Sequence, residues 1–284
     1  MRPRPFLLSA AAVCAALHVA GVLTARPIWR YAEVLSVGLL LAYAMVNRSP
    51  VSRWALGLAL AVLLADAVRT MPAARDSDGY GVQVLTPGPA PEIPSAFELG
   101  LSLCWPSLTV VLVLLVAFRR GGWRWRTAVP AVVGAALVLG YAAVRVVATW
   151  RSAAAEPPRA NDTDVADLTM AVSTAVLPPL VLGLAALALA AALLGHGRRL
   201  ASTGAALLAL MALPLVDSCI AAVPMPVYLW SDNAGLVWDA ITPTLSMPRP
   251  MPALTAVAEL TAYLLLVVGL TESPESAAAS PANA

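Results

Sequence analysis

Charged residues are scarce in this 284-residue chain, at 12% of its length, and all 18 of its basic residues are arginines. Hydrophobic residues make up 60% of the chain, and its mean hydropathy is +0.79. A soluble domain of this composition would lack the polar groups needed to cover its surface, which excludes a water-soluble fold. The few basic residues also lie too close to apolar stretches to form a nucleic-acid surface.

Cysteine is equally rare, with three residues, and so is histidine, with two. The cysteines form no Cys-x-x-Cys pair, which disfavours thiol–disulfide exchange. A haem held by two histidines is disfavoured because His18 lies inside an apolar stretch and His196 does not. Cys14 and His18 are four positions apart, on one face of a helix, but two ligands do not make a metal site. We therefore expect neither a metal nor a cofactor.

Eight apolar stretches are each long enough to cross a bilayer, and they fill most of the chain. They cover residues 6–23, 31–46, 54–68, 97–118, 128–148, 169–194, 200–222 and 253–270. The sequence therefore predicts an all-α integral membrane protein with about eight transmembrane helices. We expect two four-helix membrane halves, over 1–118 and 119–270, and a disordered cytoplasmic tail over 271–284, which is rich in Ala, Ser, Pro and Glu.

The connections between these stretches alternate in charge, which predicts their orientation. One set contains arginines and no acidic residue: Arg2 with Arg4, Arg48 with Arg53, the run from Arg119 to Arg126, and Arg198 with Arg199. By the positive-inside rule this set faces the cytoplasm. We expect a multi-pass protein of the cell membrane with both termini in the cytoplasm. The first stretch also resembles a secretory signal peptide, whose cleavage would leave seven helices in the same orientation.

Four features recur in the same order in the two halves, which indicates a parallel 4+4 internal repeat. They are Arg-x-Arg at positions 2–4 and 124–126, Trp-Arg at 29–30 and 150–151, the acids Asp66 and Asp217, and the acids Glu98 and Glu259. A parallel repeat has a pseudo-two-fold axis along the membrane normal, so equivalent residues converge on a central cavity. The alternative is chance, because Arg, Ala and Pro are common in this chain.

The acids Asp66, Asp217, Glu98 and Glu259 fall inside the apolar stretches or at their outer ends. A charged carboxylate at such depth is costly against lipid, so these residues should face the bundle interior, pair with arginine or stay protonated. Arg145 lies inside the fifth stretch and is the natural partner of Asp217 or Glu259. This set is either a proton, cation or substrate site, or a set of ion pairs that join helices, with Glu98 at the interface.

Prolines inside three of the stretches predict interrupted helices. Pro214 precedes Asp217 by three residues, Pro106 follows Cys104, and Pro178 with Pro179 divides the sixth stretch. Each removes a backbone hydrogen bond and exposes carbonyl groups, a feature that accompanies cavities in membrane helices but also occurs without any function.

Three functions fit these features. The first, which the repeat favours, is a transporter or permease-like protein that handles a small molecule or lipid through an outward-facing cavity lined by the intramembrane acids. The second is an intramembrane enzyme that acts on a lipid or isoprenoid, with Asp217 or Asp66 as general acid. The third is a non-catalytic membrane subunit that anchors a partner. The motifs of nucleotide-binding proteins and serine hydrolases are missing, so an ATP-driven role would need a separate subunit.

Overall fold

The computed structural model describes residues 3–24, 29–46, 50–70, 93–118, 125–155, 165–223 and 250–271, and in these ranges it contains eight α-helices and no strand. The helices are α1 (Pro3–Leu23), α2 (Arg30–Val46), α3 (Pro50–Arg69), α4 (Ile93–Phe118), α5 (Trp125–Ala155), α6 (Val165–Gly195), α7 (Arg199–Ala222) and α8 (Pro250–Thr271). The expected disordered tail beyond Thr271 and the long outer loops lie outside these residues.

Six of these helices are long and apolar enough to cross a membrane: α1, α4, α5, α6, α7 and α8. The apolar part of α2, Tyr31–Val46, is shorter, and α3 carries Arg53, Asp66 and Arg69 within its 20 residues. The protein is therefore an all-helical, polytopic membrane protein, and the expectation of eight membrane crossings is supported for six.

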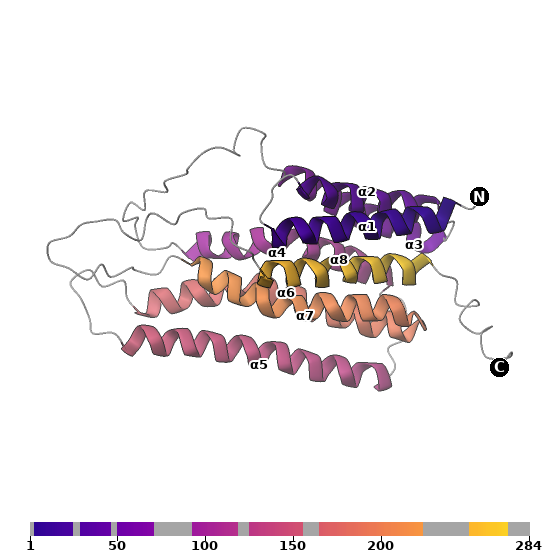
Figure 1. Ribbon diagram of the computed structural model, residues 1–284. Coiled ribbons are helices and arrows are strands. Elements are labelled where there is room, and N and C mark those ends of the chain that lie inside the picture. Colours follow the sequence, from indigo (N-terminus) through magenta and orange to yellow (C-terminus); the bar gives the residue numbers. More distant parts are fainter. Residues whose placement is uncertain are drawn as a thin grey trace.

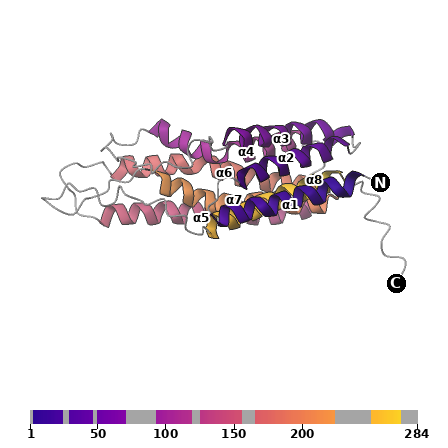
Figure 2. The same cartoon turned by 45° about the horizontal axis from the view of Figure 1, so that its top comes forward.

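The helices lie side by side in one elongated bundle with α6 near its centre (Figure 1). α6 packs along α4, α5 and α7, and it is the most buried of the six spans. α5 lies at one edge, where Val132, Leu137 and Val144 are exposed, as expected for a helix that faces lipid. At the other side α1, α2 and α3 form a layer that meets the rest through α4 and α8 (Figure 2).

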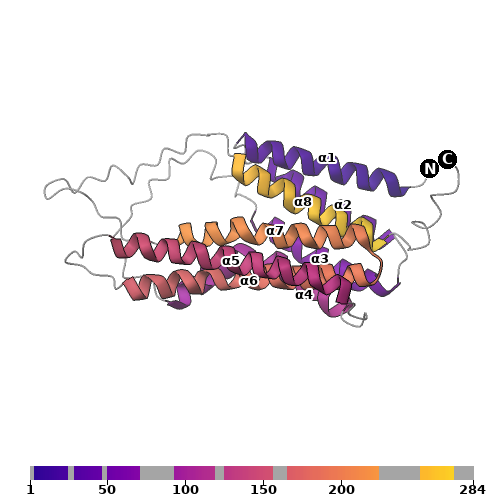
Figure 3. The ribbon, with the colours of Figure 1, turned by 90° about the horizontal axis from the view of Figure 1, so that it is seen from below.

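α1 and α8, the first and last helices, lie side by side along one face of the bundle (Figure 3). The start of α1 and the end of α8 are at the same end of the bundle. The two halves of the chain differ in their packing. In a 4+4 repeat α8 corresponds to α4 and α2 corresponds to α6, yet α4 packs extensively along α6 whereas α8 touches α2 only slightly. The internal repeat stays a prediction.

The prolines do not interrupt the helices, contrary to our expectation. α4 is continuous through Pro106, α6 through Pro178 and Pro179, and α7 through Pro214. Each of these prolines removes one backbone hydrogen bond, but the bonds on either side suffice to keep the turns of a membrane helix in register.

Glycines on α4 and α7 bring neighbouring backbones into close contact. A Cβ on Gly204 of α7 would lie 2.6 Å from the carbonyl oxygen of Ala262 on α8, and a Cβ on Gly100 of α4 would overlap the carbonyl oxygen of Ala175 on α6. Small residues allow such approaches, which supply much of the packing energy between membrane helices. These contacts hold α4 close to α6 and α7 close to α8.

The short turn between α6 and α7 holds the end of α8. The guanidinium Nη1 of Arg198 donates hydrogen bonds to the carbonyl oxygens of Gly269 (3.3 Å) and Leu270 (2.6 Å), and the group lies 5.8 Å from the ring centre of Phe118 on α4. Partial burial lowers the pKa of Arg198 from its ordinary value, yet arginine stays charged at physiological pH. A cation suits the negative end of the α8 helix dipole.

Candidate functional site

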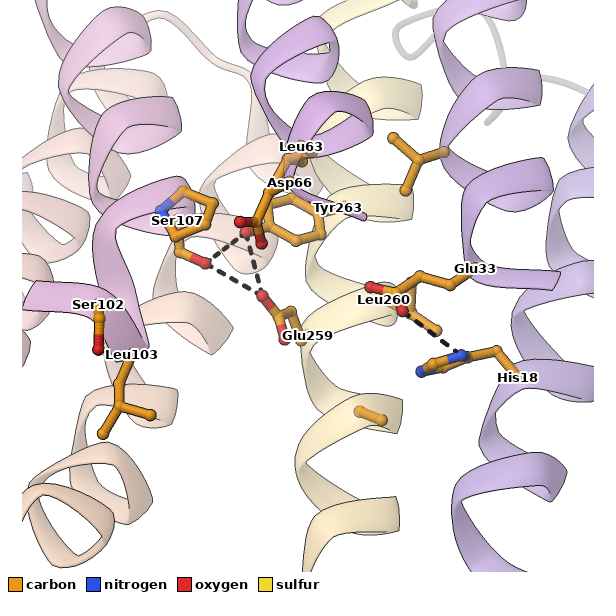
Figure 4. Close-up of a pocket in the computed structure, with 13 residues that line it drawn as sticks. His18, Glu33, Leu63, Asp66, Ser102, Leu103, Ser107, Glu259, Leu260 and Tyr263 are labelled. Atoms are coloured by element: carbon orange, nitrogen blue, oxygen red, sulfur yellow. Dashed lines mark hydrogen bonds and ion pairs between the residues drawn. The ribbon is translucent and has the colours of Figure 1, made fainter. Parts of the chain in front are cut away.

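α1, α2, α3, α4 and α8 surround a cavity of about 170 Å³, which we call the polar cavity (Figure 4). Polar side chains make up a large part of its wall. They are His18 from α1, Glu33 from α2, Asp66 from α3, Ser102 and Ser107 from α4, and Glu259 and Tyr263 from α8. A wall of this kind inside an apolar bundle is expensive to maintain, so it is a candidate functional site.

Glu259, Tyr263 and Ser107 form a hydrogen-bonded group at the wall of this cavity (Figure 4). The Ser107 hydroxyl donates to Glu259 Oε1 over 3.0 Å and lies 2.7 Å from the Tyr263 hydroxyl, which in turn lies 3.3 Å from the same carboxylate oxygen. Glu259 and Tyr263 are four residues apart and therefore share one face of α8. A carboxyl group is thus held between two hydroxyl groups from two helices.

Ser107, which donates a hydrogen bond to this carboxyl group, directly follows a proline in the sequence. Pro106 has no N–H to donate to the carbonyl oxygen of Ser102, one turn earlier, and both Ser102 and Ser107 line the polar cavity. The backbone of α4 is therefore short of one hydrogen bond where the helix borders the cavity. Such freed carbonyl groups are tolerated in membrane helices where they line a cavity.

Two further acids and one histidine complete the wall. His18 Nδ1 lies 3.6 Å from Glu33 Oε2, and His18 is buried. Asp66 Oδ1 lies 3.9 Å from Nε of Arg69, one turn further along α3. Three carboxyl groups therefore face one small cavity of low dielectric constant. Glu33 and Asp66 each have a basic side chain beside them, His18 and Arg69, whereas the described partners of Glu259 are two hydroxyl groups.

A second cavity, of about 120 Å³, lies on the other side of Glu259, and we call it the apolar cavity. Its wall includes Leu182 from α6 and Leu208, Met211 and Leu215 from α7. Leu103, Ser107 and Glu259 line both cavities. One carboxyl group thus stands between a polar space and a largely apolar one.

The site lies deep in the membrane-spanning part of the bundle. Ser107 is eleven residues from either end of the span Ala96–Phe118, which at the rise of an α-helix is about 16 Å. Glu259 is six residues from the start of the span Ala253–Thr271, or about 9 Å. A ligand at this group would therefore lie within the membrane-spanning part of the bundle, at mid-length of the α4 span and about 9 Å from one end of the α8 span.

The structure brings two of the four candidate acids, Asp66 and Glu259, to the polar cavity. Glu98 is exposed on α4 and does not belong to the wall of either cavity. Asp217 is on α7, its side chain contacts α5, and it belongs to the wall of neither cavity.

Arg145 pairs with Asp217 and not with Glu259. Arg145 Nε donates to Asp217 Oδ1 over 2.6 Å, and the Tyr141 hydroxyl donates to Oδ2 over 2.7 Å. The two charged side chains are 44% and 40% exposed, at the bundle surface. Because both carboxylate oxygens of Asp217 are satisfied, this group is suited to joining α5 to α7.

Five polar residues of the polar cavity were not among our candidates: His18, Glu33, Ser102, Ser107 and Tyr263. One of them had a signal in the sequence, because Tyr263 follows Glu259 by one helical turn. We had considered His18 with Cys14 as a pair of metal ligands, but the structure places it against Glu33. Among the residues that the structure describes, no group of three or more His, Cys, Asp or Glu side chains could hold a metal ion.

Comparison of the chain with protein families, with curated proteins and with solved structures gave no match.

Proposed function

We propose that the protein is a transporter or permease-like protein of the cell membrane, and that the polar cavity around Glu259 binds its substrate or coupling ion. The observation that carries this proposal is the group formed by Ser107, Glu259 and Tyr263, because it joins two helices by polar contacts within the membrane-spanning part of the bundle. A ligand at Glu259 can replace these contacts and so change how α4 packs on α8. That coupling is what alternating access requires.

The proposal includes an orientation, with both ends of the chain in the cytoplasm. Arg198, in the turn between α6 and α7, contacts the last residues of α8, and α1 begins at the same end of the bundle. The positive-inside rule assigns this arginine-bearing end to the cytoplasm. On this orientation Glu259 lies in the outer half of its span, and the polar cavity is closer to the outer face.

The experiment that tests transport asks whether the polar cavity is reached by water from both faces of the membrane. In a chain whose Cys14, Cys104 and Cys219 are replaced by alanine, Ser102→Cys places a single thiol on the wall of the cavity. Right-side-out and inside-out vesicles are then treated with a membrane-impermeant maleimide. A transporter should be labelled in both preparations, because the cavity opens alternately to either side.

The matched control is Ser36→Cys in the same background. Ser36 is buried, donates a hydrogen bond to the carbonyl oxygen of Ala11, and belongs to neither cavity wall, so its thiol should stay unlabelled. Labelling of Ser102→Cys from one face only would contradict transport and favour the intramembrane enzyme. Labelling from neither face would favour the anchoring subunit.

A further inference from the structure

We infer that the ligand of this site is a small organic cation with an apolar arm, whose charged head occupies the polar cavity and whose arm occupies the apolar cavity. This inference rests on the proposed function, and it names the class of substrate. Its basis is that two cavities of different character, of about 170 and 120 Å³, meet at the same carboxyl group.

The charge of the ligand follows from the wall of the polar cavity. Glu33, Asp66 and Glu259 contribute three carboxyl groups and His18 one imidazole, whereas none of the described residues that line this cavity is an arginine or a lysine. His18 lies beside Glu33 and Arg69 lies beside Asp66, whereas the described partners of the Glu259 carboxyl group are the hydroxyl groups of Ser107 and Tyr263. A cation beside Glu259 provides the missing charge.

An organic cation fits this wall better than a metal ion does. A tightly bound metal needs several ligand atoms at fixed short distances, and no described group of three or more His, Cys, Asp or Glu side chains is arranged in that way. An ammonium head spreads its charge over a larger volume and needs no fixed coordination geometry. The ring of Tyr263 in the same wall is the kind of surface that attracts such heads.

The apolar arm of the ligand is inferred from the wall of the apolar cavity. Leu182, Leu208, Met211 and Leu215 line it, and they come from α6 and α7, which contribute nothing to the polar cavity among the described residues. A ligand that extends from Glu259 into this space would contact α4, α6, α7 and α8 at once. Each methylene group it buries there should raise the affinity about fourfold.

The test compares three probes on the purified wild-type protein in lipid nanodiscs, by equilibrium dialysis. Butyltrimethylammonium has both the head and the arm, tetramethylammonium lacks three methylene groups of the arm, and 1-butanol lacks the cation. We expect butyltrimethylammonium to bind on the order of fiftyfold more tightly than tetramethylammonium, and 1-butanol to compete at least tenfold less well. Equal binding of the two cations would show that the site does not bind an apolar arm. Equal competition by 1-butanol would show that the site does not require a positive charge.

Two variants assign the binding to this carboxyl group. Glu259→Gln keeps the size and hydrogen-bonding capacity of the side chain but removes its charge, and it should weaken butyltrimethylammonium at least tenfold. Glu98→Gln makes the same change on the exposed surface of α4 and should bind as the wild type does. Unchanged binding by Glu259→Gln would show that the cation does not bind at Glu259. If a variant does not fold, the comparison of the three probes on the wild type still tests the inference.

The outcomes separate this inference from the proposed function. If Ser102→Cys is labelled from both faces and the wild type binds none of the cations, transport stands and the substrate class is wrong. If the cations bind at Glu259 and labelling occurs from one face only, the cation site stands and transport is wrong.

Discussion

Replacing Gly204 by alanine should destabilise the bundle, because this glycine brings the backbones of α7 and α8 together beside the candidate site. A Cβ at this position would lie 2.6 Å from the carbonyl oxygen of Ala262 and 2.9 Å from the amide nitrogen of Leu266. Ordinary contact begins at 3.4 Å, so α8 must retreat by about 0.8 Å, the difference between 3.4 and 2.6 Å. Tyr263 directly follows Ala262 and lies one helical turn before Leu266, so the retreat also strains its hydrogen bond to Ser107.

The magnitude follows from two opposing effects. Overpacking costs about 1–3 kcal/mol, and the upper half of that range applies here because backbone atoms cannot rotate away as a side chain does. The higher helix propensity of alanine returns about 1 kcal/mol. The free energy of unfolding should therefore fall by about 1–2 kcal/mol.

The assay is reversible unfolding from mild detergent into dodecyl sulfate, followed by far-ultraviolet circular dichroism. The control is Gly140→Ala on α5, the same chemical change where a new Cβ meets no atom within 4 Å. Gly140→Ala should be as stable as the wild type or more stable. A Gly204→Ala protein that unfolds at the wild-type midpoint would refute the close packing of α7 on α8.

The remaining predictions concern the polar contacts outside the cavities. Arg198→Gln should lower the free energy of unfolding by about 1–2 kcal/mol because it removes charged hydrogen bonds to the end of α8. Arg199→Gln, which changes an exposed side chain, should alter it little. Equal effects of the two changes in the same unfolding assay would contradict the stabilisation of α8 by Arg198. A double-mutant cycle of Asp217→Asn and Arg145→Gln should give a coupling of about 0.6–1.7 kcal/mol, near the lower value because both groups are partly exposed. A coupling of zero would mean that this pair does not join α5 to α7. Tyr141→Phe should cost about 0.5–1 kcal/mol through its lost bond to Asp217, and an unchanged stability would exclude that bond.

The helices were the most predictable part of the fold, because a membrane span must be long and apolar whatever its neighbours are. The stretch expected at 31–46 is α2, Arg30–Val46, and the stretch expected at 97–118 is most of α4, Ile93–Phe118. The largest difference is at the end of α5, which continues to Ala155 although hydropathy placed the end at 148. A helix ends where its backbone hydrogen bonds end, and polar residues such as Thr149 and Arg151 do not break them.

The site was less predictable, because it depends on which helices meet. Glu259 and Asp66 stood out in the sequence as acids in apolar stretches, and the expected repeat placed them on one cavity together with Glu98 and Asp217, which line neither of the two cavities. Glu33 was overlooked because it opens α2, near an expected membrane boundary, where an acidic residue is ordinary. Ser107 was overlooked because serine is common in membrane helices and acquires meaning only through its contacts.

The central claim, that a small molecule binds at Glu259, is tested most directly by native mass spectrometry of the protein released from mild detergent. The comparison includes the wild type, Glu259→Gln and Glu98→Gln. The account predicts a small molecule that the wild type and Glu98→Gln retain and that Glu259→Gln loses. A wild type that carries no such molecule, or a Glu259→Gln protein that carries the same one, would contradict the claim.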